Sequence, residues 1–299
     1  MYKLCQAFYL VILLCFFLPT FLSGQDLQDV RTRNVLRHIG VPYANFVTGD
    51  GRGLSVELIE RFAHYLGVRY EFVQSSWTSV ISDLIGNKVL PEGDKAVILE
   101  STPVRGDLIA NGLTILPWRQ QVLAYSAPTF PTQVWLITGS SSTLAPVSPG
   151  KNTKEDIRAV KNLLAGRTLL GKYNTCLDPR LYGLDEGDVL IRNFTGNLNS
   201  LTPAIIRGEA DAALLDVPDA LMALSRWPGQ FKILGPISDQ QQMGVAFRKD
   251  SPELLAAFNT FFNRFWKTGK YRELVRKYYP DVFDYYPDFF SRTAPESNP

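Results

Sequence analysis

The residues whose types and spacing could perform chemistry are concentrated in residues 107–119, DLIANGLTILPWR. Arg119 can hold a carboxylate through two parallel charge-assisted hydrogen bonds. The Thr114 hydroxyl and the Gly112 backbone can add others, because a short buried strand is predicted to break at the Asn-Gly pair and to continue into a Pro-Trp-Arg turn. This stretch therefore predicts recognition of a carboxylate. The alternative is an exposed arginine that follows a surface turn.

Other residue types that often carry catalysis or metal binding are sparse. His38 lies in a predicted strand and His64 on a predicted helix near its apolar face, and we interpret each as structural. No GxSxG elbow, HExxH pair or Walker loop occurs. Cys176 is the only cysteine beyond the N-terminal apolar segment, so no disulfide within the mature chain and no zinc site are expected. We expect neither a cofactor nor a metal.

Composition excludes some partner classes. The 299 residues are 45% hydrophobic and can bury one large core or two modest ones. The formal charge is +2 and no block of like charge stands out, which argues against a nucleic-acid partner.

The N-terminal residues 1–24 are typical of a secretory signal peptide. Lys3 precedes a long apolar run, and Leu-Ser-Gly at 22–24 precedes the expected cleavage site. An uncleaved membrane anchor is the alternative, because this run is nearly long enough to span a bilayer. No later segment is apolar enough to cross a membrane.

The elements that must position the site alternate between strand and helix patterns, which predicts an α/β fold with a parallel sheet. In the first half the expected strands are 35–41, 68–73, 96–99 and 108–110, and the expected helices are 53–66 and 77–85. Ser55 is predicted to cap the first of these helices and Gly67 to end it.

In the second half, residues 138–154 are rich in Ser, Thr, Pro and Gly and predict a loop or a junction between lobes. A helix is expected from Thr153, with Asp156 as a capping partner. The further expected elements are a strand and turn at 168–176, a helix at 201–207, a strand at 212–215, and helices from 252 and 271. Asp216 follows the strand at its carboxyl end, where ligands bind in open α/β sheets.

Several stretches, in order, resemble the periplasmic solute-binding proteins of the polar amino-acid type (family 3, type 2 fold). They are GLSVELIERFAHYLGV, DLIANGLTILPWR with YSAPTF after it, LAGRTLLGKYNT, RGEADAALLDVPDAL, and MGVAFRKDSPELLAAFN followed by GKYRELVRKYY. The resemblance implies two α/β lobes that hinge on crossover strands near 129–133 and 240–244. The first lobe would comprise 25–130 and 243–292, the second lobe 131–242, and residues 293–299 a disordered tail.

The same resemblance implies roles for single residues. Arg119 would grip the α-carboxylate of the ligand and Asp216 its α-ammonium, although Asp216 could instead cap a helix that begins near Pro218. The remaining implied ligand contacts are Thr114, Gly112, Thr175, an aromatic wall at Trp77, and Tyr43. Leu116, Trp118 and Cys176 depart from the family pattern towards a more apolar pocket, which leaves the side chain of the ligand open.

The function implied is that of a monomeric extracytoplasmic protein that traps an amino acid or related carboxylate, for ABC-type uptake through an inner-membrane permease or for sensing. The ending KYYPDVFDYYPDFFSR also resembles the segment that closes the binding-protein-like domain of membrane-bound lytic transglycosylase F. A stand-alone sensor of cell-wall peptides is therefore one alternative. A secreted dehydratase-like enzyme is another, because a few relatives of this fold are dehydratases.

Overall fold

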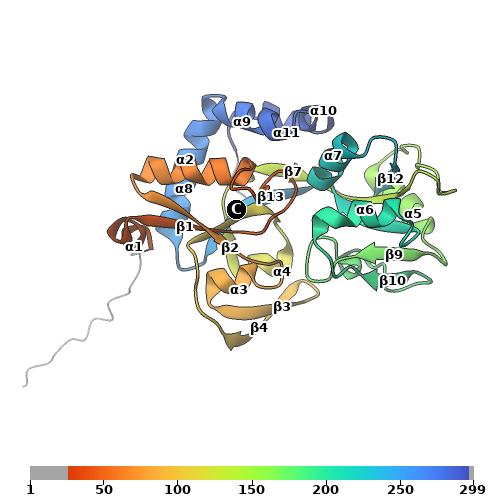
Figure 1. Ribbon diagram of the computed structural model, residues 1–299, viewed down its shortest axis with the longest axis horizontal. Helices are drawn as coiled ribbons and strands as arrows, with labels where there is room; N and C mark the ends of the chain where they lie inside the picture. The colour runs from red at the N-terminus through yellow and green to blue at the C-terminus, as the bar shows by residue number, and fades with distance from the viewer. Residues whose placement is uncertain (1–25, 296–299) are drawn as a thin grey trace, which may run out of the picture.

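The computed structural model describes residues 26–295, and these form two α/β lobes, each built around one sheet (Figure 1). The expected signal peptide at 1–24 lies outside the described residues, as do residues 296–299 of the expected tail. We call the lobe that contains β1 the first lobe and the lobe that contains β8 the second lobe.

The sheet of the first lobe has the order β2-β1-β5-β13-β6, and β7 also pairs with β13. Its strands are β1 (Val35–Gly40), β2 (Arg69–Gln74), β5 (Leu108–Thr114), β6 (Leu123–Tyr125), β7 (Phe130–Thr132) and β13 (Gln241–Arg248). The predicted parallel pairing holds for β1 with β2 and with β5. It does not hold for β13, which returns from the second lobe and runs antiparallel to β5, β6 and β7.

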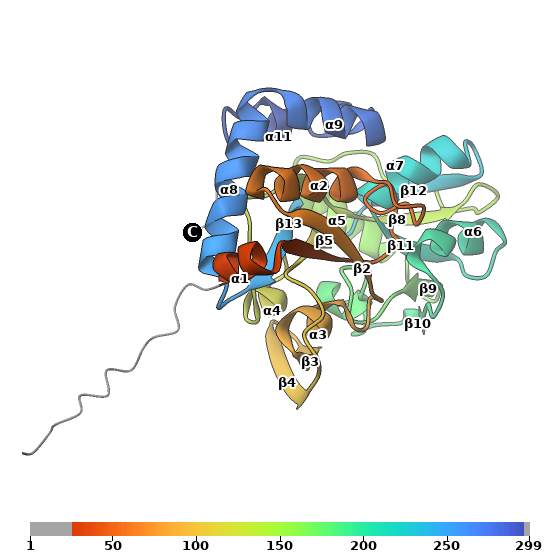
Figure 2. The same ribbon diagram turned by 60° about the vertical axis from the view of Figure 1, so that its left-hand side comes forward.

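Helices cover both faces of this sheet, as Figures 1 and 2 show. The helices of this lobe and of the C-terminal segment that follows it are α1 (Asp26–Arg33), α2 (Leu54–Leu66), α3 (Val80–Ile85), α4 (Pro117–Gln120), α8 (Pro252–Lys267), α9 (Lys270–Tyr278), α10 (Val282–Tyr285) and α11 (Pro287–Ser291). The apolar faces of α2 and α8 meet at Phe62 and Phe258, whose ring centroids are 5.2 Å apart. Such buried aromatic pairs contribute strongly to a core.

The start of α2 differs from the prediction, whereas its end does not. Ser55 is not the cap: it lies in the first turn, and its backbone N–H donates to the Phe46 carbonyl at 3.0 Å. The N–H of Leu54 donates to the Asn45 carbonyl. Backbone carbonyls of the loop therefore accept the hydrogen bonds that a capping side chain would otherwise accept. Gly67 ends the helix in the left-handed conformation, as predicted.

The predicted strand at 96–99 belongs to a two-stranded hairpin of β3 (Asn87–Glu92) and β4 (Lys95–Ser101). β3 was not predicted, because its sequence NKVLPE combines charges with a proline. The hairpin projects away from the sheet of the first lobe (Figures 1 and 2).

β5 does not break at its Asn-Gly pair. The strand continues to Thr114, and its register against β13 shifts, so the pair forms a bulge. Gly112 has φ +71°, and a Cβ there would lie 2.4 Å from the Phe46 ring. Both the backbone conformation and the close packing therefore require glycine at this position.

The sheet of the second lobe has the order β10-β9-β11-β8-β12. Its strands are β8 (Val134–Gly139), β9 (Thr168–Gly171), β10 (Leu190–Asn193), β11 (Ala212–Asp216) and β12 (Phe231–Pro236), and its helices are α5 (Thr153–Asn162), η1 (Pro179–Tyr182), η2 (Leu198–Ser200), α6 (Leu201–Ile206) and α7 (Val217–Arg226). The predicted cap of α5 is wrong: the Asn152 side chain accepts from the N–H of Glu155, and Asp156 accepts from the N–H of Gly150 at 2.6 Å.

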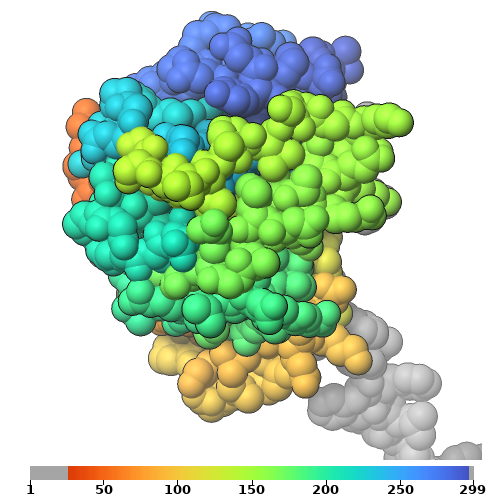
Figure 3. Space-filling view, turned by 90° about the vertical axis from the view of Figure 1, so that its right-hand side faces the viewer, coloured from red at the N-terminus to blue at the C-terminus, as the bar shows by residue number. Residues whose placement is uncertain are grey.

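The chain crosses between the lobes beside the pairing of β7 with β13. Thr132 pairs with Gln241 and Phe130 with Met243. A second link between the lobes is the C-terminal segment, since Tyr285 of α10 lies 5.7 Å from the ring of Trp135 on β8. In Figure 3 the blue C-terminal residues lie along one edge of the green and cyan second lobe.

Candidate functional site

Arg119 lies on α4, directly after β5, and is only 2% exposed. One guanidinium nitrogen, Nη1, donates to the Thr114 carbonyl at 2.9 Å. Its Nε is also buried and has no partner. The surface-arginine alternative is therefore wrong. A buried cation that keeps an unused donor is suited to an anionic ligand, because an unsatisfied buried donor costs free energy.

Asp216 supplies a buried carboxylate on the second lobe. It ends β11, is 1% exposed, and accepts a hydrogen bond from the hydroxyl of Tyr43, which follows β1 in the first lobe. Burial raises the pKa of Asp216 to about 6, and the hydrogen bond from Tyr43 opposes this rise. Asp216 occupies the N-cap position of α7, but its side chain makes no capping hydrogen bond.

The charges of Arg119 and Asp216 both act on the thiol of Cys176. Its Sγ is 3.7 Å from Asp216 Oδ2. Burial and the negative charge of Asp216 raise the pKa of the thiol to about 12, and the positive charge of Arg119 opposes this rise. The thiol therefore stays protonated near neutral pH and is a poor nucleophile. The effects of Arg119 and Asp216 on this one thiol place both charged groups within electrostatic reach of Cys176.

Aromatic side chains form a wall beside Asp216. The rings of Tyr43 and Trp77 meet edge to face with centroids 5.3 Å apart. Burial and the nearby charge of Asp216 raise the pKa of Tyr43 well above its ordinary value, so its hydroxyl remains a donor. The indole Nε1 of Trp77 is buried and has no hydrogen-bond partner.

Two further polar side chains near Arg119 have unsatisfied groups. Both amide atoms of Asn111 are buried without a partner, and Thr114 Oγ1 is buried with no partner at hydrogen-bond geometry, although it lies close enough to the Cys176 thiol to lower the pKa of that group. Buried polar groups are normally paired, so a cluster of exceptions indicates that something else completes them. Asn111 was not predicted as a site residue. The signal that could have identified it is a polar residue inside an otherwise apolar strand.

Thr175 and Gly112 are placed differently from the other predicted contacts. The Thr175 hydroxyl donates to the Lys172 carbonyl at 2.7 Å and accepts from the N–H of Leu177 at 3.1 Å, so its only proton is used within its own loop. Thr175 lines a cavity of about 410 Å³ next to the tip of the β3–β4 hairpin. Gly112 forms the bulge described above.

Asp219, on the first turn of α7, is a buried acid that the sequence did not single out. Its Oδ2 has no partner, and burial, followed by the charge of Asp216, raises its pKa well above the ordinary value. Burial and the neighbouring acid therefore both favour the neutral form of Asp219.

His38 is structural, as predicted. It is fully buried in β1, and its ring bonds the Ala110 carbonyl at 2.6 Å and the Tyr70 hydroxyl at 2.8 Å. Burial lowers its pKa to about 4, which keeps the ring neutral near pH 7. His64 is exposed on α2.

Comparison with known proteins supports the same fold and class. The family model of the bacterial extracellular solute-binding proteins, family 3, matches residues 96–281. Membrane-bound lytic murein transglycosylase F of Desulfosudis oleivorans is 26% identical over 239 residues, which are 78% of this chain and 45% of the relative. The chain thus spans less than half the length of that relative. The L-cystine-binding protein TcyJ of Escherichia coli is 23% identical over 241 residues, 80% of this chain and 79% of the relative.

Among solved structures, a mutant of the T. maritima protein ArgBP has a TM-score of 0.67 at 24% identity and covers 85% of this chain and 99% of its own. The ancestral amino-acid-binding protein AncCDT-1, a precursor of cyclohexadienyl dehydratase, has a TM-score of 0.66 at 21% identity, with 85% and 98% covered. These likenesses establish the two-lobed type 2 fold. Within residues 26–295 no helix has the length and apolar character needed to span a bilayer. By the extent of the family match, this chain belongs to the bacterial extracellular solute-binding proteins of family 3.

Proposed function

We propose that this chain traps a small carboxylate-bearing ligand, an amino acid, between its two lobes. The observation that carries the proposal is a buried pair of opposite charges that both act on Cys176: Arg119 with an unused donor, and Asp216 from the other lobe. A zwitterion needs a fixed cation and a fixed anion that are desolvated together. The name of one relative reported above, an L-cystine-binding protein, agrees with this class of ligand.

In this proposal Arg119 binds the α-carboxylate, with Thr114 and Gly112 as neighbouring contacts. Asp216 binds the α-ammonium, which either competes with Tyr43 for Oδ1 or uses Oδ2, the oxygen next to Cys176. The further assigned contacts are the wall of Trp77 and Tyr43, and Thr175, whose hydroxyl would have to turn away from Lys172.

The wider role belongs to the same proposal. The chain would be exported through the signal peptide at 1–24 and act in the periplasm as a monomer, delivering its ligand to an inner-membrane permease of the ABC type or reporting its concentration. The lobe boundaries, 25–130 with 243–292 for the first lobe and 131–242 for the second, are proposed with it. Simple binding without turnover is the activity expected.

Calorimetric titration with L-cystine, L-arginine, L-lysine and L-glutamine tests the proposal. Arg119→Ala should weaken binding of the active amino acid by about 2–5 kcal/mol, because the carboxylate would be buried without a partner. Arg119→Lys should also bind poorly, since a point charge cannot replace the two-pronged guanidinium. Arg207→Ala, an exposed arginine paired with Glu209, is the matched control and should bind normally. Equal affinities of Arg119→Ala and the control would contradict the assignment.

A stand-alone sensor of cell-wall peptides is the second candidate, favoured by the 26% identity to transglycosylase F. Muropeptides that bind in preference to free amino acids, with the same dependence on Arg119, would support it. A dehydratase-like enzyme is the third, suggested by the likeness to a dehydratase precursor. Release of product from arogenate or prephenate would distinguish it from a binding protein.

A further inference from the structure

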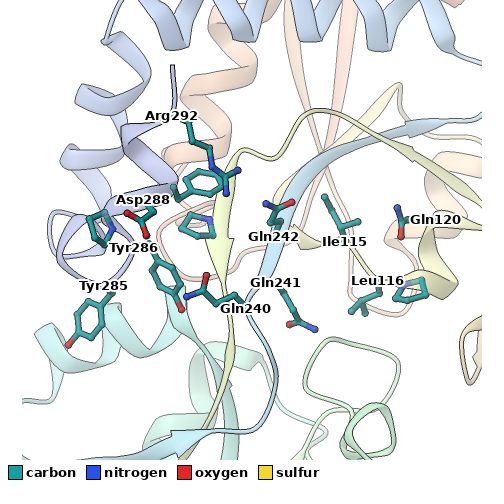
Figure 4. A pocket seen from close by; sticks show the side chains of 14 residues that line it. Ile115, Leu116, Gln120, Gln240, Gln241, Gln242, Tyr285, Tyr286, Asp288 and Arg292 are labelled. Carbon is teal, nitrogen blue, oxygen red and sulfur yellow. The ribbon is translucent and has the colours of Figure 1, made fainter. Parts of the chain in front are cut away.

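A cavity of about 610 Å³ lies at the hinge, outside the site described above. Its walls are the crossover residues Gln240 to Gln242, the chain that leads into α4, and the C-terminal helices α10 and α11 (Figure 4). Neither Arg119 nor Asp216 lines it. The volume lies within the range of roughly 300–1,000 Å³ that is usual for small-molecule sites. We call this space the hinge cavity.

The hinge cavity has a charged group of each sign. Arg292 and Asp288, two exposed residues of the C-terminal segment, both line it (Figure 4). Within residues 26–295 neither side chain takes part in an ion pair. The Arg292 guanidinium lies 5.0 Å from the centroid of the Phe289 ring. The backbone carbonyl of Arg292 accepts a hydrogen bond from Trp266 Nε1 at 3.0 Å. The backbone that carries the cation is therefore anchored, while its hydrogen-bonding edge is available.

Amide and apolar groups complete the walls. Gln240, which directly precedes β13, and Gln242 on β13 lie on the side that faces α11, and Gln241 lies on the other side (Figure 4), as expected for successive residues of an extended chain. The amide of Gln240 can donate and accept hydrogen bonds. Pro131 and Phe289 supply apolar surface. A cation, an anion and an amide above apolar walls match a small molecule that carries both charges.

We propose that the hinge cavity is a second binding site, specific for a small zwitterion. Arg292 holds the carboxylate of this molecule, Asp288 holds its ammonium, and Gln240 contacts its polar backbone or side chain. The proposal is independent of the assignment of Arg119 and Asp216, because neither of these residues lines the hinge cavity and neither Arg292 nor Asp288 is an assigned contact of the cleft.

The position of the hinge cavity links its occupant to the movement of the lobes. The occupant would touch the crossover strand β13 and the segment whose Tyr285 packs on Trp135 of the second lobe. Lobe closure in hinged proteins changes the backbone at such crossovers. Binding in the hinge cavity therefore alters the affinity of the cleft, and by reciprocity the cleft ligand alters the affinity of the hinge cavity.

The test is calorimetric titration of the full chain with L-glutamine, L-arginine and glycylglycine, each alone. For at least one probe we expect a binding event that Arg292→Gln and Asp288→Asn each weaken at least about tenfold. Two exposed residues of the same region serve as matched controls: Arg276→Gln, whose guanidinium also lies 5.0 Å from a phenylalanine ring centroid, and Asp284→Asn on α10. The controls should change that event less than about twofold. The event should persist in Arg119→Ala.

Three results would overturn the proposal. None of the probes gives an event that depends on Arg292 and Asp288; the variants and their controls behave alike; or acetate binds as tightly as the zwitterions, which would leave a site for anions only. Failure of the cleft assignment is distinguishable, because it concerns only the event that Arg119→Ala removes.

Discussion

Asp216→Asn is expected to make the ligand-free protein more stable at pH 8 while weakening its binding of an amino acid. The pKa of Asp216 rises from 3.8 to about 6 on folding, so the folded chain binds more protons than the unfolded chain between these values. Stability attributable to this group is therefore highest below pH 4 and falls as the pH rises to about 6. The rise of the pKa from 3.8 to about 6 lowers the free energy of unfolding at pH 8 by about 3 kcal/mol.

Asparagine removes the cost of burying a charged carboxylate, and its side-chain oxygen can still accept the hydrogen bond from Tyr43. After allowing for the cost of burying its own amide, we expect a gain of about 1–3 kcal/mol at pH 8 and almost none at pH 4. Urea unfolding followed by tryptophan fluorescence at pH 4, 5, 6.5 and 8 measures this difference. Asp239→Asn, at an exposed position, is the control for the loss of a carboxylate.

A loss of stability in Asp216→Asn that is equal at pH 4 and pH 8 would refute the reasoning, because it would mean that the charge carries no cost on folding. The effect of Asp216→Asn on ligand binding is measured separately from its effect on stability. Affinity for an amino acid should fall at least tenfold, about 1.4 kcal/mol, while the same molecule without its amino group should bind nearly as before.

Three other perturbations test the surrounding structure. Small-angle scattering should show a smaller radius of gyration once ligand saturates the protein, because the lobes rotate about β7 and β13; an unchanged profile at saturation argues against a hinged trap. Gly112→Ala should destabilise the protein by about 1–3 kcal/mol, since φ is +71° and the new Cβ would lie 2.4 Å from the Phe46 ring; a thermal melt that matches the parent would disprove this strain. Cys176, with a pKa of about 12, should react slowly with a disulfide reagent at pH 8 in the native state and quickly in urea, and equal rates would show that the thiol is accessible.

Local signals in the sequence were sufficient for much of the fold. The end of α2 at Gly67 followed from glycine alone, because the left-handed conformation is a property of that one residue. The start of α2 did not follow in this way, because its first N–H groups bond carbonyls of the loop at 45–46, which folds back on the helix. β3 was missed because its pairing with β4, and not its composition, makes it a strand.

The candidate site divides in a similar way. Residue type and position relative to a strand were enough to single out Arg119 and Asp216, since few side chains can hold a carboxylate or an ammonium at a strand end. Their roles towards a ligand stay predictions. Asn111 and Asp219 were overlooked because burial, which the sequence does not display, is what makes them unusual.

The sequence by itself determined the α/β class, the order of most strands and helices, and the chemical types available for a site, because these depend on periodicity and side-chain chemistry along the chain. Only the tertiary structure decided which groups meet. Tyr43 and Asp216 are separated by 173 residues yet share a hydrogen bond, and the pKa of that acid depends on the protein packed around it. Contact and desolvation are properties of the assembled lobes, since both arise only when distant segments exclude water together.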